Sequence, residues 1–160
     1  MVVAFARISD GSVWAAGGTR LLKINPSTLD TVTVTLPFTA NSSWDAWHPG
    51  SITASTSENA IFIANNGTFT GGTTIYKYIV GAPSSLASPF ITIASGDELY
   101  GAGIGYDASN NTLVVTTVQS GGTTHYSVND LDIYNAGTGA LITDLDYTGY
   151  WFPAIPVFHH

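Results

Sequence analysis

The sequence of 160 residues predicts an all-β protein. Only 9% of the residues are charged, which is few for a helical protein, because Glu, Lys and Arg are among the residues that favour helices. Aromatic residues make up 12% of the chain, and Thr, Val and Ile are frequent, as is usual in strands. No segment combines a helical hydrophobic period with helix caps. A chain of this length is enough for one domain with a hydrophobic core.

An internal repeat of about fifty residues indicates which all-β fold this is. The stretch "GSITASTSENAIFIANN", from Gly50, aligns with "GAGIGYDASNNTLVVTT", from Gly101, and Ile52, Ile104 and Ile155 hold equivalent positions. Each unit has a short apolar strand, a polar turn, a run of β-forming residues, a Gly-rich loop, an alternating strand and a closing strand. Four short strands in about 40–50 residues are typical of a β-propeller blade.

We therefore expect residues 1–160 to form a single segment of a β-propeller with four-stranded antiparallel blades. The blade-like repeats cover about residues 3–38, 50–95 and 101–146, and an extra strand follows at residues 152–158. Propellers usually close with four to eight blades, so three blades and one strand predict an incomplete propeller. Further blades or a second copy of the chain would then complete it. A β-sandwich is the alternative fold.

The connections between strands predict two unlike faces. In a propeller, the turns after the first and third strands of each blade open on one face, here called the turn face. The loop before each blade and the loop after its second strand open on the other, the loop face. "SSWDAWHPG", "GDELYGAG", "YTGYWFPA" and the long "VQSGGTTHYSVND" all belong to the loop face. They predict a ligand site, because aromatic groups around a concavity favour binding. Its candidate residues are Trp44, Trp47, His48, Tyr100, His125, Tyr126, Tyr150 and Trp151.

These aromatic residues have a second interpretation. They could pack between neighbouring blades and bind nothing, which is the core role we expect for Trp14, Phe62 and Tyr134. The carboxylates of the loop face also have two interpretations: a cation site or general acid–base pair, or solvated charges at a rim. We expect solvated charges. The residues concerned are Asp45, Asp97, Glu98 and Asp130.

Composition and short motifs exclude several functions. The net charge of −7, with only four basic residues, argues against nucleic acid and against an anionic membrane surface. No cysteine is present, and no apolar run reaches the roughly 18 residues of a spanning helix, so we expect neither thiol chemistry nor membrane insertion. No signal peptide is visible. "DASNN" (residues 107–111) lacks the glycine and glutamate of a calcium loop and is expected to be a turn. We predict no cofactor and no metal, and assign no function to His159 and His160, which resemble the start of a tag.

Part of the sequence resembles a known family. "YGAGIGYDASNNTLVVT" and "DLDIYNAGTGALITDLDYTGYWFPAIPVF" resemble the surface-layer-type propellers of Bacteroidetes, which include a domain family of unknown function and the cell-surface cobalamin-binding propeller. The resemblance covers residues 51–158, and the first blade more weakly. It implies a longer propeller of about seven blades, with this chain as its C-terminal part. It also implies an extracellular, lipid-anchored, non-catalytic module that captures a ligand, although no anchor cysteine is present. No corrinoid-contacting residue is transferred from the family.

Together these observations predict a non-catalytic binding module at a bacterial cell surface. Its ligand would contain rings, such as a corrinoid or a glycan, because aromatic side chains stack on flat groups. Two alternatives stay open. One is a cation-dependent propeller enzyme, similar to a lactonase or a lyase. The other is a purely structural scaffold of a surface layer.

Overall fold

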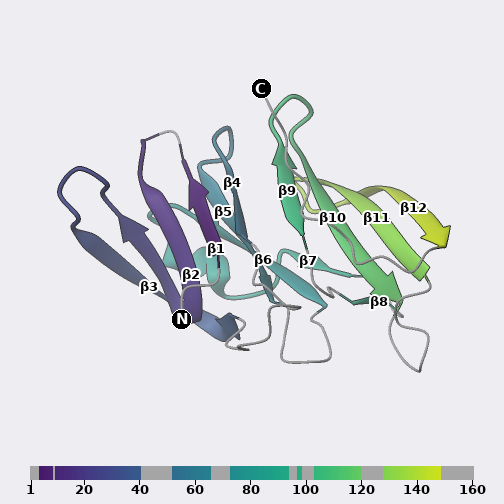
Figure 1. The fold of residues 1–160 in the computed structure, drawn as a ribbon, viewed down its shortest axis with the longest axis horizontal. Helices are drawn as coiled ribbons and strands as arrows, with labels where there is room; N and C mark the ends of the chain where they lie inside the picture. Colours follow the sequence, from purple (N-terminus) through teal and green to yellow (C-terminus); the bar gives the residue numbers. More distant parts are fainter. Residues whose placement is uncertain are drawn as a thin grey trace.

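The computed structural model describes residues 4–8, 10–40, 52–65, 73–93, 97–98, 103–119 and 128–148. These residues form twelve β-strands and one short 3₁₀ helix, arranged in three antiparallel sheets. The prediction of an all-β fold is confirmed. Figure 1 shows the sheets in sequence order, from the purple N-terminal strands to the yellow-green C-terminal strands.

The first sheet has the strand order β1–β2–β3 and covers the first predicted repeat, extending two residues past its end at residue 38. The second has the order β4–β5–β6–β7 and lies within the second repeat, with the 3₁₀ helix η1 between β6 and β7. The strands of these two sheets are β1 (Ala4–Arg7), β2 (Val13–Ile24), β3 (Thr31–Ala40), β4 (Ile52–Ser55), β5 (Ala60–Asn65), β6 (Thr74–Ile79) and β7 (Ile91–Thr92), and η1 covers Pro83–Leu86.

The third sheet has the order β12–β11–β10, and two short strands share the inner edge of β10. Strand β9 pairs with the first half of β10, whereas β8 pairs with its last two residues, Val118 and Gln119. The innermost strand of this blade is therefore formed in two pieces. The strands are β8 (Asp97–Glu98), β9 (Ile104–Asp107), β10 (Thr112–Gln119), β11 (Val128–Asn135) and β12 (Leu141–Thr148).

Strand β2 serves as two strands of the first blade. A straight strand rises about 3.3 Å per residue, which would separate Trp14 from Lys23 by roughly 30 Å. The Nζ atom of Lys23 nevertheless lies 5.9 Å from the centre of the Trp14 ring. The chain must therefore fold back within β2, and Gly18, with a φ of +59°, supplies the left-handed conformation that such a turn needs. The turn at Gly17 and Gly18 thus lies within the bounds of β2.

The innermost strands of successive sheets are neighbours, as in a propeller. Strand β4 contacts β1 on one side and β9 on the other. Ile52 begins β4 and Ile104 begins β9, and both are buried, so their predicted equivalence is confirmed. Ile155 lies outside the described residues.

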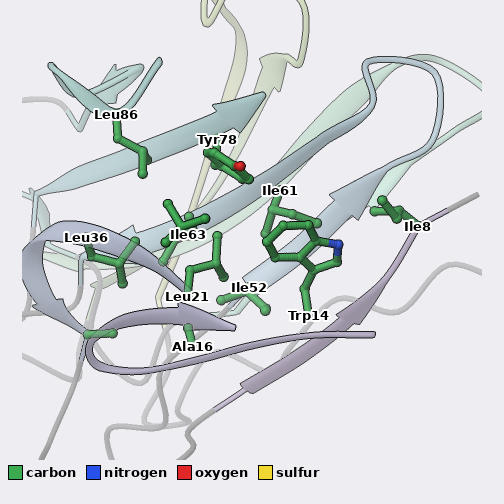
Figure 2. Packing of buried hydrophobic residues seen from close by; sticks show 12 residues of the cluster. Ile8, Trp14, Ala16, Leu21, Leu36, Ile52, Ile61, Ile63, Tyr78 and Leu86 are labelled. Atoms are coloured by element: carbon green, nitrogen blue, oxygen red, sulfur yellow. The ribbon is translucent and has the colours of Figure 1, made fainter. Parts of the chain in front are cut away.

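The hydrophobic core lies between the sheets as two clusters. The cluster between the first and second sheets includes Trp14, Leu21, Ile61 and Tyr78, and Figure 2 shows these side chains converging from both sheets. The rings of Trp14 and Tyr78 have centres 5.4 Å apart. The cluster between the second and third sheets includes Phe62, Leu113 and Tyr134. The predicted core roles of Trp14, Phe62 and Tyr134 are confirmed.

Strand β5 shows how one sequence serves both clusters. Side chains alternate between the two faces of a strand, so Ile61 and Ile63 face the first sheet while Phe62 and Ala64 face the third. All four are at most 2% exposed. A continuous apolar run is what a strand covered on both faces requires.

Hydrogen bonds join the turns of each blade on the predicted turn face. The backbone amide of Val80 donates to the carbonyl of Asn59, and the amide of Ala136 donates to that of Asn111, each at 3.0 Å. In the first blade, Lys23 Nζ bonds Asp10 Oδ2 at 2.7 Å. The turns after the first and third strands of each blade therefore lie on one face.

Candidate functional site

All eight residues of the predicted ligand site lie outside the described residues: Trp44, Trp47, His48, Tyr100, His125, Tyr126, Tyr150 and Trp151. The strand ends to which their segments connect are described. The chain leaves β3 at Ala40 and enters β4 at Ile52, leaves β10 at Gln119 and enters β11 at Val128, and leaves β12 at Thr148. By strand pairing, these ends lie opposite the turn face. The site itself stays a prediction.

Buried polar groups lie at the interface between the second and third sheets. Tyr134 donates a hydrogen bond of 2.9 Å from its hydroxyl to Asp132 Oδ2, and each residue is only 4% exposed. Thr117, farther toward the loop face, is fully buried, and its Oγ1 makes no hydrogen bond. Burying a carboxylate or a hydroxyl among apolar side chains costs free energy unless the group forms hydrogen bonds. Buried polar groups are therefore unusual between these two sheets.

Asp132 did not emerge from the sequence reasoning, which named Asp130 instead. The period of two in "NDLDIYN" places Asp132 on the same face as Tyr134, a residue predicted to be core. The strand pairing confirms this, because Asp132 lies opposite Val115 and Tyr134 opposite Leu113. The sequence pattern that could have revealed the buried carboxylate is thus an acidic residue two positions before a core tyrosine, on the same face of the strand. The side chain of Asp130 lies outside the described residues.

The turn face of the first blade carries a cleft of about 310 Å³. Most of its polar groups are used within the turns. Asp10 accepts hydrogen bonds from Lys23 Nζ at 2.7 Å and from the Ser12 amide at 2.8 Å, and Asn25 Oδ1 accepts one from the Ser27 amide at 2.9 Å. These bonds are ordinary turn chemistry, so the cleft does not indicate a ligand. Its lining residues are Arg7, Asp10, Gly11, Ser12, Asn25, Pro26 and Ser27.

Lys23 also changes the acidity of Asp10. The hydrogen bond from Lys23, together with those from Ser12, lowers the pKa of Asp10 from its ordinary value of 3.8 to about 2. A positive partner and a donated hydrogen bond both favour the ionised carboxylate. The Asp10 side chain is 46% exposed, however, so this ion pair lies in solvent.

A second polar cluster joins the second and third sheets on the turn face. Glu58, in the turn after β4, accepts a hydrogen bond of 2.8 Å from Asn111 Nδ2 at Oε1 and one of 3.2 Å from Lys77 Nζ at Oε2. Lys77 also donates at 2.8 Å to the carbonyl oxygen of Ala136. The hydrogen bond from Asn111, and then that from Lys77, lowers the pKa of Glu58 below its ordinary range. A single carboxylate therefore holds an amine and an amide from two different blades.

Two hydroxyl groups complete this cluster on the side of Asn111. The Tyr106 hydroxyl donates to Asn111 Oδ1 at 3.0 Å, Ser57 Oγ lies 3.4 Å from the same oxygen, and the two hydroxyls also bond each other. Lys77 is buried, and its Nζ lies 4.7 Å from the centre of the Phe90 ring and 5.5 Å from that of Phe62. The amine is thus enclosed by two aromatic rings, one carboxylate and one carbonyl.

The stretch that resembles a calcium loop is a turn. Asp107 accepts hydrogen bonds from the Ser109 amide at 2.9 Å and from Asn110 Nδ2 at 2.7 Å, as short turns commonly do. Asn111 has a φ of +53°, a conformation that Asn tolerates better than most residues. In the described part of the chain, no three His, Asp or Glu side chains gather into a metal site.

Comparison with known proteins places the chain in a family. A family model described as a domain of unknown function, DUF5074, matches residues 1–159. The chain belongs to this family. No curated protein matches the sequence. The described part of this DUF5074 chain contains no helix with the length and apolar character needed to span a bilayer.

A solved structure supports the predicted fold. The DUF5074 chain is similar to a quinonprotein alcohol dehydrogenase-like protein from Bacteroides thetaiotaomicron VPI-5482, with a TM-score of 0.71 and 24% sequence identity. The match covers 90% of this chain but 33% of that one, so the chain spans about a third of the length of its structural relative. At this identity the likeness shows the fold alone. With the antiparallel sheets, it confirms the prediction of an all-β, partial β-propeller.

Proposed function

We propose that this DUF5074 chain is part of a β-propeller that captures a ring-containing ligand on its loop face, at a bacterial cell surface, without catalysing a reaction. The observation that carries the proposal is the difference between the two faces. On the turn face, the described connections are bonded to each other or to neighbouring strands, and all of them are short except the one between β6 and β7, which contains η1. The connections that hold eight candidate binding residues all join strand ends on the opposite side.

The chemistry of these connections supports a flat or cyclic ligand. Three of the four tryptophans of the chain, Trp44, Trp47 and Trp151, belong to them, whereas Trp14 is in the core. Tryptophan and tyrosine rings bind flat groups by stacking and contribute much of the energy at binding sites. A corrinoid or a glycan has such a surface. The resemblance to the surface-layer-type propellers of Bacteroidetes supports the corrinoid and the cell-surface location.

We also propose that the chain does not catalyse a reaction. The printed name of the structural relative mentions alcohol dehydrogenase, but 24% identity over a third of that protein does not transfer an activity. A propeller enzyme would need a reactive group held at the loop face, such as a bound cation beside a general base. Loss of an activity on removal of a bound metal would contradict our proposal and favour that alternative.

Calorimetry tests the proposed binding directly. We expect saturable heat when the chain is titrated with cyanocobalamin or with a member of a glycan panel. Trp47→Ala and Trp151→Ala should each weaken that binding at least tenfold, whereas Val32→Ala, an exposed side chain on β3, should leave it unchanged. Circular dichroism of each variant checks the fold. Unchanged affinity in both tryptophan variants would show that the loop face is not the site.

A titration of this chain that shows no binding heat leads to a second experiment. The chain spans a third of its structural relative, so the same ligands should be tested with the longest natural protein that contains this domain. Binding by the longer protein alone would show that the site needs further blades. No binding by either protein, with both folded, would contradict ligand capture and favour the structural role.

A further inference from the structure

We propose that two copies of this chain associate head to tail and close a six-bladed propeller. The head face is the outward face of the first sheet, around Val13 and Leu22, and the tail face is the outward face of the third sheet, around Leu131 and Leu145. Neither face has another sheet on it among the described residues, and Figure 1 shows the two sheets at opposite ends of the row. The inference is independent of the proposed ligand binding.

The internal repeat relates the tail face to a blade interface that the structure contains. Strands β4 and β9 begin at residues 52 and 104, and the same separation relates Ala64 on β5 to Thr116 on β10. Ala64 lies opposite Ile75, and Thr116 lies opposite Leu131. Leu131 therefore holds in the third blade the place that Ile75 holds in the second.

The tail face is apolar but only partly covered. Ile75 lies opposite Ile91 on the outermost strand of its sheet, and Leu131 lies opposite Leu145 in the same way. Ile75 and Ile91 are at most 2% exposed, because the third sheet packs on them. Leu145 is 50% exposed and Leu131 is half-buried. Residues that are core between the second and third blades thus have exposed counterparts on the tail face, which is typical of an interaction surface.

The head face combines apolar residues with an arginine. Trp14 and Leu21 point toward the second sheet, so their neighbours Val13 and Leu22 belong to the outward face. Both of these residues are half-buried. Arg7 lies opposite Val13 and therefore belongs to the same face. A blade that packs on the head face must accommodate this positive charge.

Arg7 holds the place that Tyr106 holds between the second and third blades. Arg7 lies opposite Val13 and Tyr106 lies opposite Leu113, and in both hairpins one more bonded pair follows before the turn. The Tyr106 hydroxyl bonds the hydroxyl of Ser57, which lies in the turn between β4 and β5 of the preceding blade. In a head-to-tail pair, Arg7 of one copy therefore reaches the turn between β9 and β10 of the other copy.

That turn offers a carboxylate. Ser109 holds the place of Ser57, 52 residues later, and its amide donates a hydrogen bond of 2.9 Å to Asp107. Carboxylate oxygens accept several hydrogen bonds, and a guanidinium group is their strongest side-chain partner. The guanidinium group of Arg7 is exposed and forms no hydrogen bond or ion pair within its own copy, as far as the chain is described. We therefore pair Arg7 of each copy with Asp107 of the other.

The distribution of charge along the chain also favours a second copy, in this orientation. Three of the four basic residues, Arg7, Arg20 and Lys23, lie in the first blade. Residues 97–160 contain seven of the eleven acidic residues and no lysine or arginine. Opposite charges at the two ends attract head to tail and oppose a tail-to-tail contact. A head-to-tail interface closes when the rotation allows it, and two copies of three blades give six, within the usual range of four to eight.

Light scattering after size-exclusion chromatography measures the number of copies. The purified chain should have the mass of two chains, and dilution should give only dimer and monomer. A mass of one chain at every concentration would overturn the proposal and favour further blades of a longer protein as the cover of both faces. Masses that keep growing beyond two chains as the concentration rises would overturn the closed ring. Leu145→Glu, on the tail face, should raise the dissociation constant of the dimer at least tenfold.

A charge swap tests the pairing of Arg7 with Asp107. Arg7→Asp places two carboxylates together at both interfaces, and Asp107→Arg places two guanidinium groups together there. Each variant alone should raise the dissociation constant of the dimer at least tenfold. An equimolar mixture of the two should form a dimer again, because each of its interfaces then contains one pair of opposite charges. A mixture that stays monomeric, with both variants folded by circular dichroism, would overturn the pairing.

Two further variants serve as controls. Asp107→Asn keeps an acceptor for the Ser109 amide and removes only the charge, so it should fold even where Asp107→Arg does not, and should still weaken the dimer. Asp144→Arg changes an exposed carboxylate of the same blade that lies opposite Asp132, on the face toward the second sheet. It should leave the dissociation constant unchanged. Equal weakening by Asp144→Arg and Asp107→Arg would overturn the specific contact and indicate an effect of net charge.

Discussion

The side-chain amide of Asn111 donates a hydrogen bond of 2.8 Å to the carboxylate of Glu58. This bond joins the turn after β9 to the turn after β4, in two neighbouring blades. Elsewhere the two sheets meet mainly through aliphatic and aromatic side chains. Adjacent blades are thus held by a hydrophobic centre and by a polar clasp on the turn face. Both features lead to measurable expectations.

The hydrophobic contribution can be measured at Phe62. This side chain is fully buried and its ring centre lies 5.8 Å from that of Phe90 and 6.5 Å from that of Tyr106. Phe62→Ala should lower the free energy of unfolding by about 3–5 kcal/mol, because it removes apolar contacts and leaves a cavity. Urea denaturation measures the change. The matched substitution Val32→Ala, at an exposed position, should change it by less than about 0.5 kcal/mol. Equal effects at the two positions would contradict the packing described here.

Trp14 should tolerate one substitution much better than another. It is 1% exposed, and its Nε1 atom has no hydrogen-bond partner. Trp14→Phe removes this unsatisfied donor and should therefore cost less than about 2 kcal/mol, whereas Trp14→Ala should cost about 3–5 kcal/mol. Thermal unfolding followed by circular dichroism compares the two variants. A Trp14→Phe protein as unstable as Trp14→Ala would indicate that the indole nitrogen has a partner in solution, such as an ordered water.

Two glycines with positive φ separate backbone strain from steric clash. Gly81 has a φ of +88° and open space where a Cβ would lie, whereas Gly139 has a φ of +76° and its Cβ would lie 2.8 Å from the carbonyl oxygen of Phe90. Gly81→Ala should cost about 1 kcal/mol, from strain alone. Gly139→Ala should cost clearly more, because the Phe90 backbone must also move. Chemical denaturation of the pair measures the difference, and equal costs would show that the clash is relieved cheaply.

Asp10 should contribute a small, acid-sensitive part of the stability. Its pKa is lowered in the folded state by Lys23 and Ser12, so the unfolded chain takes up the proton more readily. The stabilisation is therefore complete above its ordinary pKa of 3.8 and is lost as the pH falls toward 2. Because the side chain is 46% exposed, solvent screening limits the contribution to less than about 1 kcal/mol.

Unfolding curves at pH 6 and pH 3, recorded for the wild type and for Asp10→Asn, measure this contribution by their double difference. High salt should reduce it. A difference that grows as the pH falls would have the wrong sign for a lowered pKa.

Local sequence patterns were sufficient for much of the fold. The alternation of side chains, the turn residues and the repeat predicted the three blades, because each of these signals acts between residues close together in the chain. The turn at "DASNN" is an example, since Asp107 bonds Ser109 and Asn110 within the same turn. The ligand site was predicted from the same connections, but its eight residues lie outside the described part of the chain.

Local sequence patterns did not predict the contacts between blades. Nothing in the sequence relates Glu58 to Asn111, or Lys77 to Ala136, because residues so far apart meet only when one sheet packs against the next. Asp132 was missed for the same reason: its alternation with Tyr134 was visible, but its burial follows from the neighbouring sheet.

The sequence by itself therefore determined the strands, their turns and their repetition, through short-range backbone and side-chain preferences. Only the tertiary structure decided which faces of the strands are buried together and which polar groups become partners, since burial and long-range hydrogen bonds depend on how whole sheets stack.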